Sequence, residues 1–299
     1  MANIKRIEAA LASYAGRGSA ARDGRLEFFE GIWTIQARHA EAAAGSSGYR
    51  LPSAAEVSEC VAHGECVTHR APIPVSADAL GRAAAEIGAY CLEAGGFVDE
   101  QARTLEQAAW EALAQRLPVD AAGANPEAFL ESAAAAAEKD GLEDAGLVAT
   151  VFSLALRPLL ESDAARIAGL MKAGLALSAN AEGRPLRCPV CGCAPAASYV
   201  GRIPGNDGNG KLLWCAQCGA DWEFERVRCP HCGTREQKKL HYLSIEGDDA
   251  HRAYCCDECG GYVRTTFVGE GSLAPFSFDV ENAAMVDLDA MMRARVRDA

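Results

Sequence analysis

Ten of the thirteen cysteines in this 299-residue chain lie between Cys188 and Cys259, and their spacing suits metal binding. Eight of the ten form four CxxC pairs. Two residues between cysteines allow a tight turn to direct both sulfurs at one centre, and two such turns supply a tetrahedron of thiolates. Four thiolates suit Zn²⁺ or a single iron ion. We therefore predict two metal ions per chain, Fe or Zn, held by Cys188, Cys191, Cys215, Cys218, Cys229, Cys232, Cys256 and Cys259.

The four pairs belong to an internal repeat, because adding 41 to each cysteine number of the first quartet gives the second quartet. "RCPVCG" at 187–192 aligns with "RCPHCG" at 228–233, and the turn "GNDGNG" at 205–210 aligns with "EGDDAH" at 246–251. The 23 residues between the two pairs of each quartet accommodate two strands and a polar tip. The repeat favours sequential quartets, although a site built from the two middle pairs is an alternative.

Two other interpretations of the pairs are reactive dithiols of the thioredoxin type and buried thiols. A redox CxxC normally starts a helix in a βαβ context, and no such context is visible here. "CPxCG" with an aromatic residue nearby is similar to the knuckle of rubredoxin, which holds iron, and the same knuckle occurs in zinc ribbons. The ligand set therefore does not distinguish iron from zinc.

The cysteines outside the four pairs are not expected to be ligands. Cys255 aligns with Trp214 in the repeat, so its thiol is expected to point away from the metal. Cys193 is expected to sit beside the first metal as a bystander, and Cys91 in "AYCLEAGG" is expected to be a core thiol.

Histidines offer weaker candidates. "CVAHGECVTH" places Cys60, His63, Cys66 and His69 three apart, but Gly64 interrupts the helix and the spacing matches no closed metal site. His231 lies between two predicted ligands in a turn that we expect to be exposed. The two remaining candidates are expected to be surface or strand residues: His241 and His251.

Residues 1–177 are predicted to form helices. "RLEFFEGIWTIQARHAEAAAG" carries an apolar stripe from Leu26 to Gln36. Ser76 and Asn125 are predicted N-caps of two further helices. We also predict a helix over 143–157 that ends at Pro158, and another from about 162 to 175. The stretches 12–24 and 45–76 are predicted to be loops or irregular connections.

Beyond residue 178 the pattern changes to short β-prone pieces such as "ASYVGRI", "KLLWC", "KLHYLSI" and "GYVRTTFV". The predicted fold class is therefore α plus small β, a helical N-terminal domain followed by tandem rubredoxin-like or zinc-ribbon modules. The predicted domains are the helical domain 1–180, the metal modules 181–226 and 227–270, and a partly helical tail 271–299.

Charge and composition disfavour several classes of protein. The net charge is −12, and residues 1–180 hold 15 basic and 24 acidic residues. A nucleic-acid binder is expected to have a basic face, and the sequence gives no sign of one. The start of the chain does not look like a secretory signal, and the longest apolar run, Leu147–Leu156, is too short to cross a bilayer. We predict a cytoplasmic protein without membrane insertion. Because motifs of common catalytic sites are missing from the sequence, we do not predict an enzyme.

The cysteine-rich half resembles the family of formate dehydrogenase accessory proteins called FdhE. The matching stretches are "CPVCGCAPAASYV", "LLWCAQCGADWEFERVRCPHCG" and "KLHYLSIEGDDAHRAYCCDECGGYVR", with the link Trp222, Arg226 and Cys229. The tail "DVENAAMVDLDAMM" is similar too, so the specific resemblance covers about 187–292. It implies a cytoplasmic maturation factor that binds the formate dehydrogenase catalytic subunit, holds iron through its CxxC motifs and is not an enzyme.

Three functions are therefore compared. The first is the accessory protein implied by the resemblance. The second is a rubredoxin-like redox or oxygen-sensing module, and the third is a zinc-ribbon nucleic-acid binder, which the acidic composition disfavours.

Overall fold

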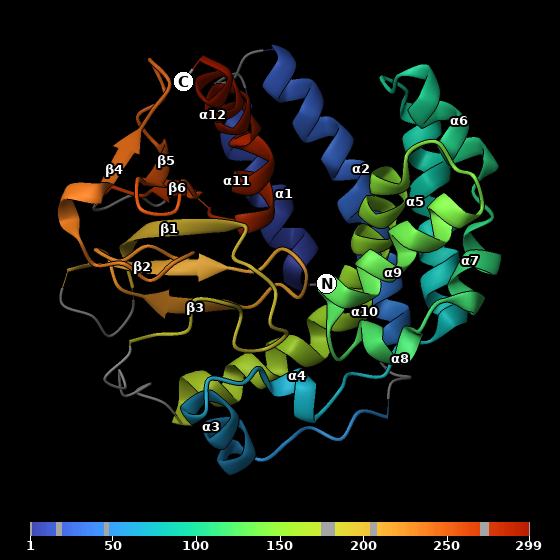
Figure 1. Cartoon of the computed structure of the whole chain (residues 1–299), viewed down its shortest axis with the longest axis horizontal. Helices are drawn as coiled ribbons and strands as arrows, with labels where there is room; N and C mark the ends of the chain where they lie inside the picture. Colours follow the sequence, from blue (N-terminus) through green and yellow to red (C-terminus); the bar gives the residue numbers. More distant parts are fainter. Residues whose placement is uncertain are drawn as a thin grey trace.

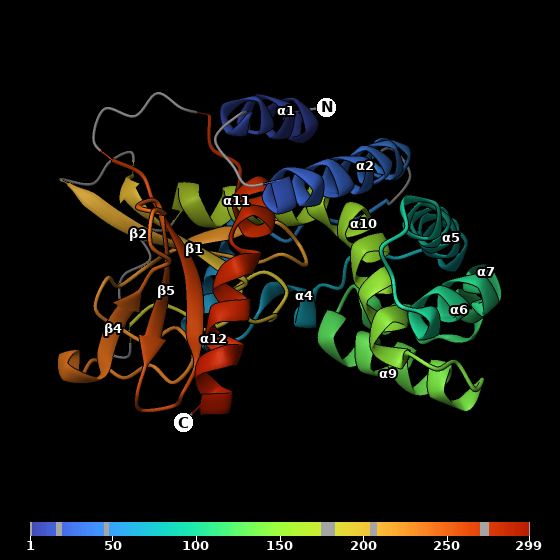
Figure 2. The same ribbon diagram turned by 90° about the horizontal axis from the view of Figure 1, so that it is seen from above.

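The computed structural model of the chain has a helical part and a six-stranded sheet that lie side by side (Figures 1 and 2). It describes residues 2–15, 20–44, 48–174, 183–203, 208–269 and 275–298. The predicted fold class is confirmed, because helices come first and two four-cysteine clusters follow on a small sheet. The predicted domain boundaries stay a prediction.

The helical part has an apolar core, and its largest fully buried side chains include Ile32, Phe129 and Phe152. The predicted caps are confirmed, since the Ser76 side chain accepts a hydrogen bond from the Ala79 amide and the Asn125 side chain accepts one from Ala128. The helices of this part are α1 (Ala2–Tyr14), α2 (Ala20–Ala43), α3 (Ala54–Ala62), α4 (Val67–Arg70), α5 (Ala77–Ala94), α6 (Asp99–Gln107), α7 (Trp110–Arg116), α8 (Val119–Ala122), α9 (Pro126–Lys139) and α10 (Ala145–Gly174).

Two loop predictions are wrong. The stretch 45–76 contains helices α3 and α4, and α3 begins with a capping box in which Ser53 and Glu56 exchange hydrogen bonds with each other's backbone amides. The S-x-x-E spacing was therefore a usable signal among the scattered prolines and glycines. The stretch 12–24 is also mostly helical, with α1 ending at Tyr14 and α2 starting at Ala20; residues 16–19 lie outside the described residues.

The predicted helix break at Pro158 is wrong as well, because α10 continues through this residue. A proline inside a helix cannot donate to the carbonyl four residues earlier, which here is Leu154. The side chain of Gln36 on α2 replaces the missing donor, with its Nε2 2.8 Å from the Leu154 oxygen. A contact between α2 and α10 thus compensates for the missing backbone N–H of Pro158. The sequence pattern of α10 alone does not predict this contact.

Helix α10 is also long and apolar enough to cross a membrane by length and composition. Half of its most apolar window is buried inside the protein, and a single helix of this kind is weak evidence for a membrane span. The fully buried side chains on α10 include Phe152, Leu156 and Ile167, which supports a core role.

The sheet consists of two copies of the 41-residue repeat. Each copy is an antiparallel meander of three strands, and the strand order is β3-β2-β1-β6-β5-β4. Because β1 pairs in parallel with β6, the second repeat is displaced sideways relative to the first and keeps its direction. The strands are β1 (Ala197–Arg202), β2 (Asn209–Trp214), β3 (Asp221–Phe224), β4 (Leu240–Leu243), β5 (His251–Cys256) and β6 (Tyr262–Phe267).

The repeat predicts this arrangement in part. The β-prone pieces named in the sequence coincide with β1, β2, β4 and β6, whereas β3 and β5 were not among them. The polar tip "GNDGNG" lies partly outside the described residues. The predicted helical tail is confirmed and consists of α11 (Phe278–Ala284) and α12 (Val286–Asp298).

The C-terminal helices join the two parts. Val280 and Ala284 of α11 are buried against Leu26 and Trp33 of α2. On the sheet side, the ring of Phe278 stacks on that of Trp214 with centroids 5.5 Å apart. The tail therefore has apolar contacts with both the helical part and the sheet.

A buried polar network reinforces this junction. His251 of β5 is 3% exposed and lies 2.8 Å from a Glu281 oxygen of α11 and 2.9 Å from an Asp248 oxygen. Tyr14 of α1 donates to the same Glu281 carboxylate, and Arg22 of α2 pairs with Asp248. Although burial opposes the charged imidazolium, the hydrogen bonds to Asp248 and Glu281 raise the pKa of His251 to about 9.

We expect the chain to become less stable as pH rises, because of His251. Its folded pKa lies above the ordinary value of 6.5, so its contribution is fully present below pH 6.5 and is lost as pH rises through 9. The contribution is on the order of 3 kcal/mol at most. Urea unfolding between pH 6.5 and 9.5 measures the free energy of unfolding, and His251→Gln should reduce the slope of this free energy against pH. The matched variant His241→Gln, on the half-exposed strand β4, should keep it; equal slopes for all three chains would contradict this role.

Loss of the Gln36 side chain should destabilise the chain by about 1–3 kcal/mol, because the Leu154 carbonyl loses its replacement donor. Pro158→Ala restores a backbone N–H at that position. The double variant Gln36→Leu/Pro158→Ala should therefore be more stable than Gln36→Leu alone, as measured by thermal unfolding. Additive effects of the two substitutions would show that the Gln36 amide does not serve this carbonyl.

Candidate metal centres

All four CxxC pairs form the same hydrogen-bonded turn, which explains why both sulfurs of a pair point in one direction. In the first turn the Cys188 amide donates to the Cys193 carbonyl at 2.9 Å, and the Gly192 amide donates to the Cys188 carbonyl at 2.8 Å. The equivalent bonds occur in the other three turns. A glycine follows each pair with φ between 71° and 80°, a conformation that side chains disfavour: Gly192, Gly219, Gly233 and Gly260.

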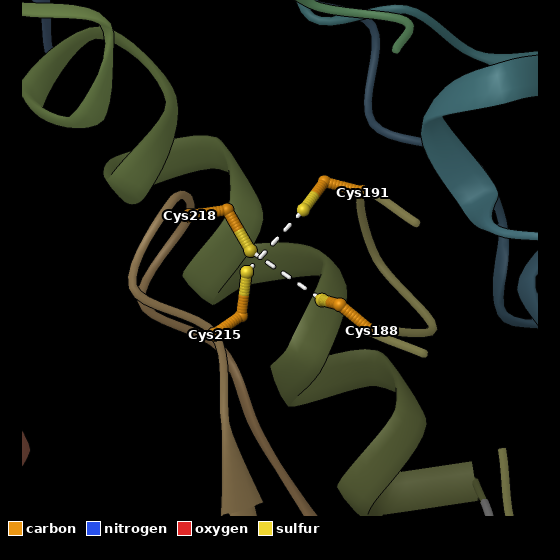
Figure 3. Close-up of side chains that lie close together, drawn as sticks. All are labelled: Cys188, Cys191, Cys215 and Cys218. Atoms are coloured by element: carbon orange, nitrogen blue, oxygen red, sulfur yellow. Dashed lines mark hydrogen bonds between the residues drawn. The ribbon is translucent and has the colours of Figure 1, made fainter. Parts of the chain in front are cut away.

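The turns bring the cysteines together as two quartets. We call Cys188, Cys191, Cys215 and Cys218 the first cluster, and Cys229, Cys232, Cys256 and Cys259 the second cluster; within each, all sulfurs lie within 4.8 Å of one another. The four sulfurs of the first cluster converge on a common point from two loops (Figure 3). The structure thus groups the cysteines sequentially and does not join the two middle pairs.

The sulfur separations fit a tetrahedral metal site. Cys188 and Cys218 Sγ are 3.6 Å apart, Cys191 and Cys215 Sγ are 3.5 Å apart, and the corresponding distances in the second cluster are 3.7 and 3.8 Å. A tetrahedron with Zn–S bonds of about 2.3 Å has edges of about 3.8 Å. A disulfide would need about 2.05 Å. Each cluster could therefore hold one metal ion.

The first cluster is fully buried, with its four cysteines between 0 and 2% exposed. Helix α4 holds one side of it, because the amides of Val67 and Thr68 donate to the carbonyls of Pro189 and Val190 at 3.0 Å. These two carbonyls belong to the residues between Cys188 and Cys191. A short helix that the sequence did not predict thus fixes the first turn.

Helix α10 holds the other side. Arg157 donates to the Ala216 carbonyl between Cys215 and Cys218, and its guanidinium also lies 5.4 Å from the Trp214 ring centroid. Ser153 and Gln217 are joined by two hydrogen bonds, of 2.8 and 3.2 Å. Arg157 also pairs with Glu161 and Asp279, at 3.2 and 3.5 Å, so this buried charge is held between two carboxylates and the turn of the first cluster.

Burial and contacts among the thiols of the first cluster shift their pKa values in opposite directions. Burial raises the pKa of Cys188, because a buried thiolate lacks solvation. Hydrogen bonds from the neighbouring thiols, Cys188 first among them, lower the pKa of Cys215. A metal ion would replace these shared protons, since thiolates and not thiols are metal ligands.

The second cluster is half exposed. Cys229 and Cys256 are buried, but Cys232 and Cys259 are exposed. The Cys229 sulfur accepts hydrogen bonds from the amides of His231 and Cys232 at 3.3 and 3.5 Å. These bonds stabilise a thiolate, as in other sites where backbone amides point at sulfur.

A buried lysine lies on the inner side of the second cluster. Lys211 of β2 is 1% exposed, and its ammonium is 3.8 Å from the ring centroid of Tyr254 on β5. Two strands separate β2 from β5 in the sheet order, so this contact requires a strongly curved sheet. Burial lowers the pKa of Lys211 to about 7, whereas a Cys229 thiolate favours its charged form.

The cysteines outside the predicted ligand set occupy three kinds of place. Cys255 turns toward α12, with its sulfur 3.9 Å from the Met292 sulfur. Cys193 is buried beside the first cluster, close enough to hydrogen-bond Cys191. The core prediction for Cys91 is confirmed, since it is 3% exposed inside the helical core.

The CVAHGECVTH motif does not form a metal cluster in the described part of the chain. Cys60 and Cys66 are buried, whereas the exposed His63 ring bonds to the Glu59 carbonyl. Cys66 and His69 instead pack closely against Gly192 of the first turn.

The three remaining candidate histidines lie as follows. His231 is exposed in its turn, as expected, and its ring contacts the Tyr262 carbonyl at 2.9 Å. His241 and His251 are both strand residues, but His251 is buried in the polar network described above.

A cleft of about 720 Å³ opens where the helical part meets both clusters. Val61 and Leu186 give it an apolar wall, and the turns of Cys188 and His231 reach its rim. Its charged and polar lining consists of Ser58, Glu65, His69, Arg184, Arg187, Arg228 and His231.

Sequence reasoning missed Arg157, Lys211 and the contact of α4 with the first turn. A lone arginine inside the apolar "LALRPLL" was a usable signal, because an isolated charge in a core helix needs a partner. Lys211 in "KLLWC" gave no such signal, since a lysine at the end of a strand is commonly exposed.

Comparisons with known proteins agree with this description. A protein FdhE homolog of Stutzerimonas stutzeri is 35% identical over 107 residues, which make up 35% of this chain and 33% of the relative. The homolog of Pseudomonas aeruginosa is 36% identical over 93 residues, 29% of each chain. The matched stretches thus span about a third of the curated relatives, and no family model matches the chain.

The similarity in fold covers more of the chain than the similarity in sequence. The crystal structure of the FdhE protein from Pseudomonas aeruginosa superimposes with a TM-score of 0.53 at 18% identity, covering 98% of this chain and 92% of that one. The resemblance predicted from the cysteine-rich half is confirmed. The chain is thus a relative of the FdhE proteins, by sequence over about a third of its length and by fold over almost all of it.

Proposed function

We propose that the chain is an accessory protein for the maturation of formate dehydrogenase, that it holds Fe or Zn in both cysteine clusters, and that it acts in the cytoplasm. The observation that carries this proposal is the pair of tetrahedral four-sulfur clusters on an FdhE-like fold. The partner of such a protein is the catalytic subunit of formate dehydrogenase, as the family resemblance implies.

The metal part of the proposal is supported by chemistry as well as by geometry. Sulfur-only ligand sets select zinc or iron over magnesium and calcium. Buried Arg157 lies beside the first cluster, and buried Lys211 lies beside the second, where a Cys229 thiolate favours the charged form of the lysine. The metal ions would therefore stabilise the sheet, in which each three-strand repeat is too small for a core of its own.

The cleft beside both clusters is the surface that we assign to the partner. A polypeptide segment seated there would touch the helical part through Val61 and both turns through Cys188 and His231. Three arginines line it, and each is paired with a glutamate of the chain itself: Arg184 with Glu223, Arg187 with Glu127 and Arg228 with Glu225. The apolar wall is therefore what the cleft offers to a partner, and we propose that the segment carries apolar side chains.

Metal analysis of variants tests the ligand assignment. Cys256→Ser should leave one metal ion per chain, because a ligand of the second cluster is lost. Cys255→Ser should keep both ions, since that sulfur turns toward Met292. The adjacent positions make the two variants matched controls, and the absorption spectrum of protein purified without oxygen distinguishes red iron from colourless zinc. Loss of metal from Cys255→Ser would contradict the assignment.

A pull-down with the catalytic subunit of formate dehydrogenase as bait tests the partner. The wild-type chain should be captured under anaerobic, reducing conditions. Val61→Arg, which fills the cleft, should weaken capture by about tenfold or more, as for other central interface residues.

The control is Ala79→Arg in a second groove of about 660 Å³ on the helical part, away from the clusters. This variant should be captured like the wild type. Equal loss in both variants would remove the cleft assignment, and absence of wild-type capture would count against the accessory function itself.

A further inference from the structure

The two clusters share one architecture but differ in access to solvent. In the first cluster every cysteine is buried. In the second, the second cysteine of each pair, Cys232 and Cys259, is exposed. The two exposed cysteines occupy equivalent places in the two turns, so this side of the second cluster faces solvent.

The clusters also differ in what holds their turns. Both turns of the first cluster are bound to the helical part, one by the amides of Val67 and Thr68 and the other by Arg157 and by Ser153, which exchanges hydrogen bonds with Gln217 of the turn. Among the described residues, the turns of the second cluster have no hydrogen bond to α4 or α10, and Arg228 of the first of these turns donates to the Arg184 carbonyl of the segment before the first cluster. The Asp257 amide donates to the Lys239 carbonyl at 2.9 Å, and Glu258 pairs with Lys239 at the surface.

This difference sets the cost of opening each site. To release a ligand, the first cluster must break contacts with two helices and admit water into a buried volume. The second cluster needs only rotation of an exposed cysteine side chain. Local opening is cheapest where few buried contacts hold a segment, so ligand exchange should be faster at the second cluster.

We infer that the second cluster is an exchangeable metal site that soft thiolate or chelating ligands can reach through Cys232 and Cys259, whereas the first cluster is a permanent structural site. This inference rests on the metal binding proposed above and not on the proposed partner. It gives the two halves of the repeat different roles: the first joins the sheet to the helices, and the second presents a reactive metal beside the cleft.

The test is the release of zinc from the zinc-loaded full chain to a chromogenic chelator. Release should occur in two phases of one ion each, with rates that differ by about tenfold or more. Cys259→Ser should abolish the fast phase and keep the slow one. Gln217→Ala, which removes a contact of α10 with the first cluster, should accelerate the slow phase and leave the fast one unchanged.

Alkylation of the zinc-loaded wild type provides a readout that does not depend on the folding of a variant. Iodoacetamide labelling followed by peptide mass analysis should mark Cys232 and Cys259 before any cysteine of the first cluster. Release of both ions in one phase, or earlier labelling of Cys188 or Cys218, would overturn the inference. A chain that binds no zinc at all would overturn it together with the proposed metal binding.

Discussion

The parallel pairing of β1 with β6 determines where both cysteine clusters lie. It joins two three-strand repeats, each near the size of about 40 residues below which a chain usually needs a metal, a disulfide or a partner to fold. The seam contains a polar pair, with Ser198 and Thr265 fully buried and their hydroxyls 2.7 Å apart. Since the strands on either side of the seam run in the same direction, the turns of both repeats gather at the same end of the sheet. The cleft and the shared curvature around Lys211 follow from that arrangement.

The helical part does not contact the two clusters at this end of the sheet equally. It contacts the first cluster through α4 and α10, and it contacts the opposite side of the sheet through α11 and the His251 network. The first cluster is therefore part of the core, whereas the second cluster has no such contact with α4 or α10 among the described residues. Two clusters with the same ligand spacing have different environments, because α4 and α10 pack against one of them.

The cysteine quartets could be predicted from the sequence because ligand geometry is local: two intervening residues and a following glycine define each turn. The helix caps at Ser76 and Asn125 are local as well and were predicted correctly. The continuity of α10 through Pro158 was not predictable, since it depends on Gln36 of another helix. For the same reason the burial of His251 could not be predicted, because its partners lie on other elements that are distant in the chain.

The sideways displacement of the repeats leaves the sheet with two unlike edges. The free edge at β3 is the third strand of one repeat and the free edge at β4 is the first strand of the other, which are the same kinds of strand that meet at the seam. Copies of the protein could in principle add to one another edge to edge without end. The segment before the first cluster lies along one of these edges: the Trp222 indole of β3 donates to the Pro185 carbonyl, and Glu223 pairs with Arg184. The two edges of the sheet therefore differ in their surroundings as well as in their place in the repeat.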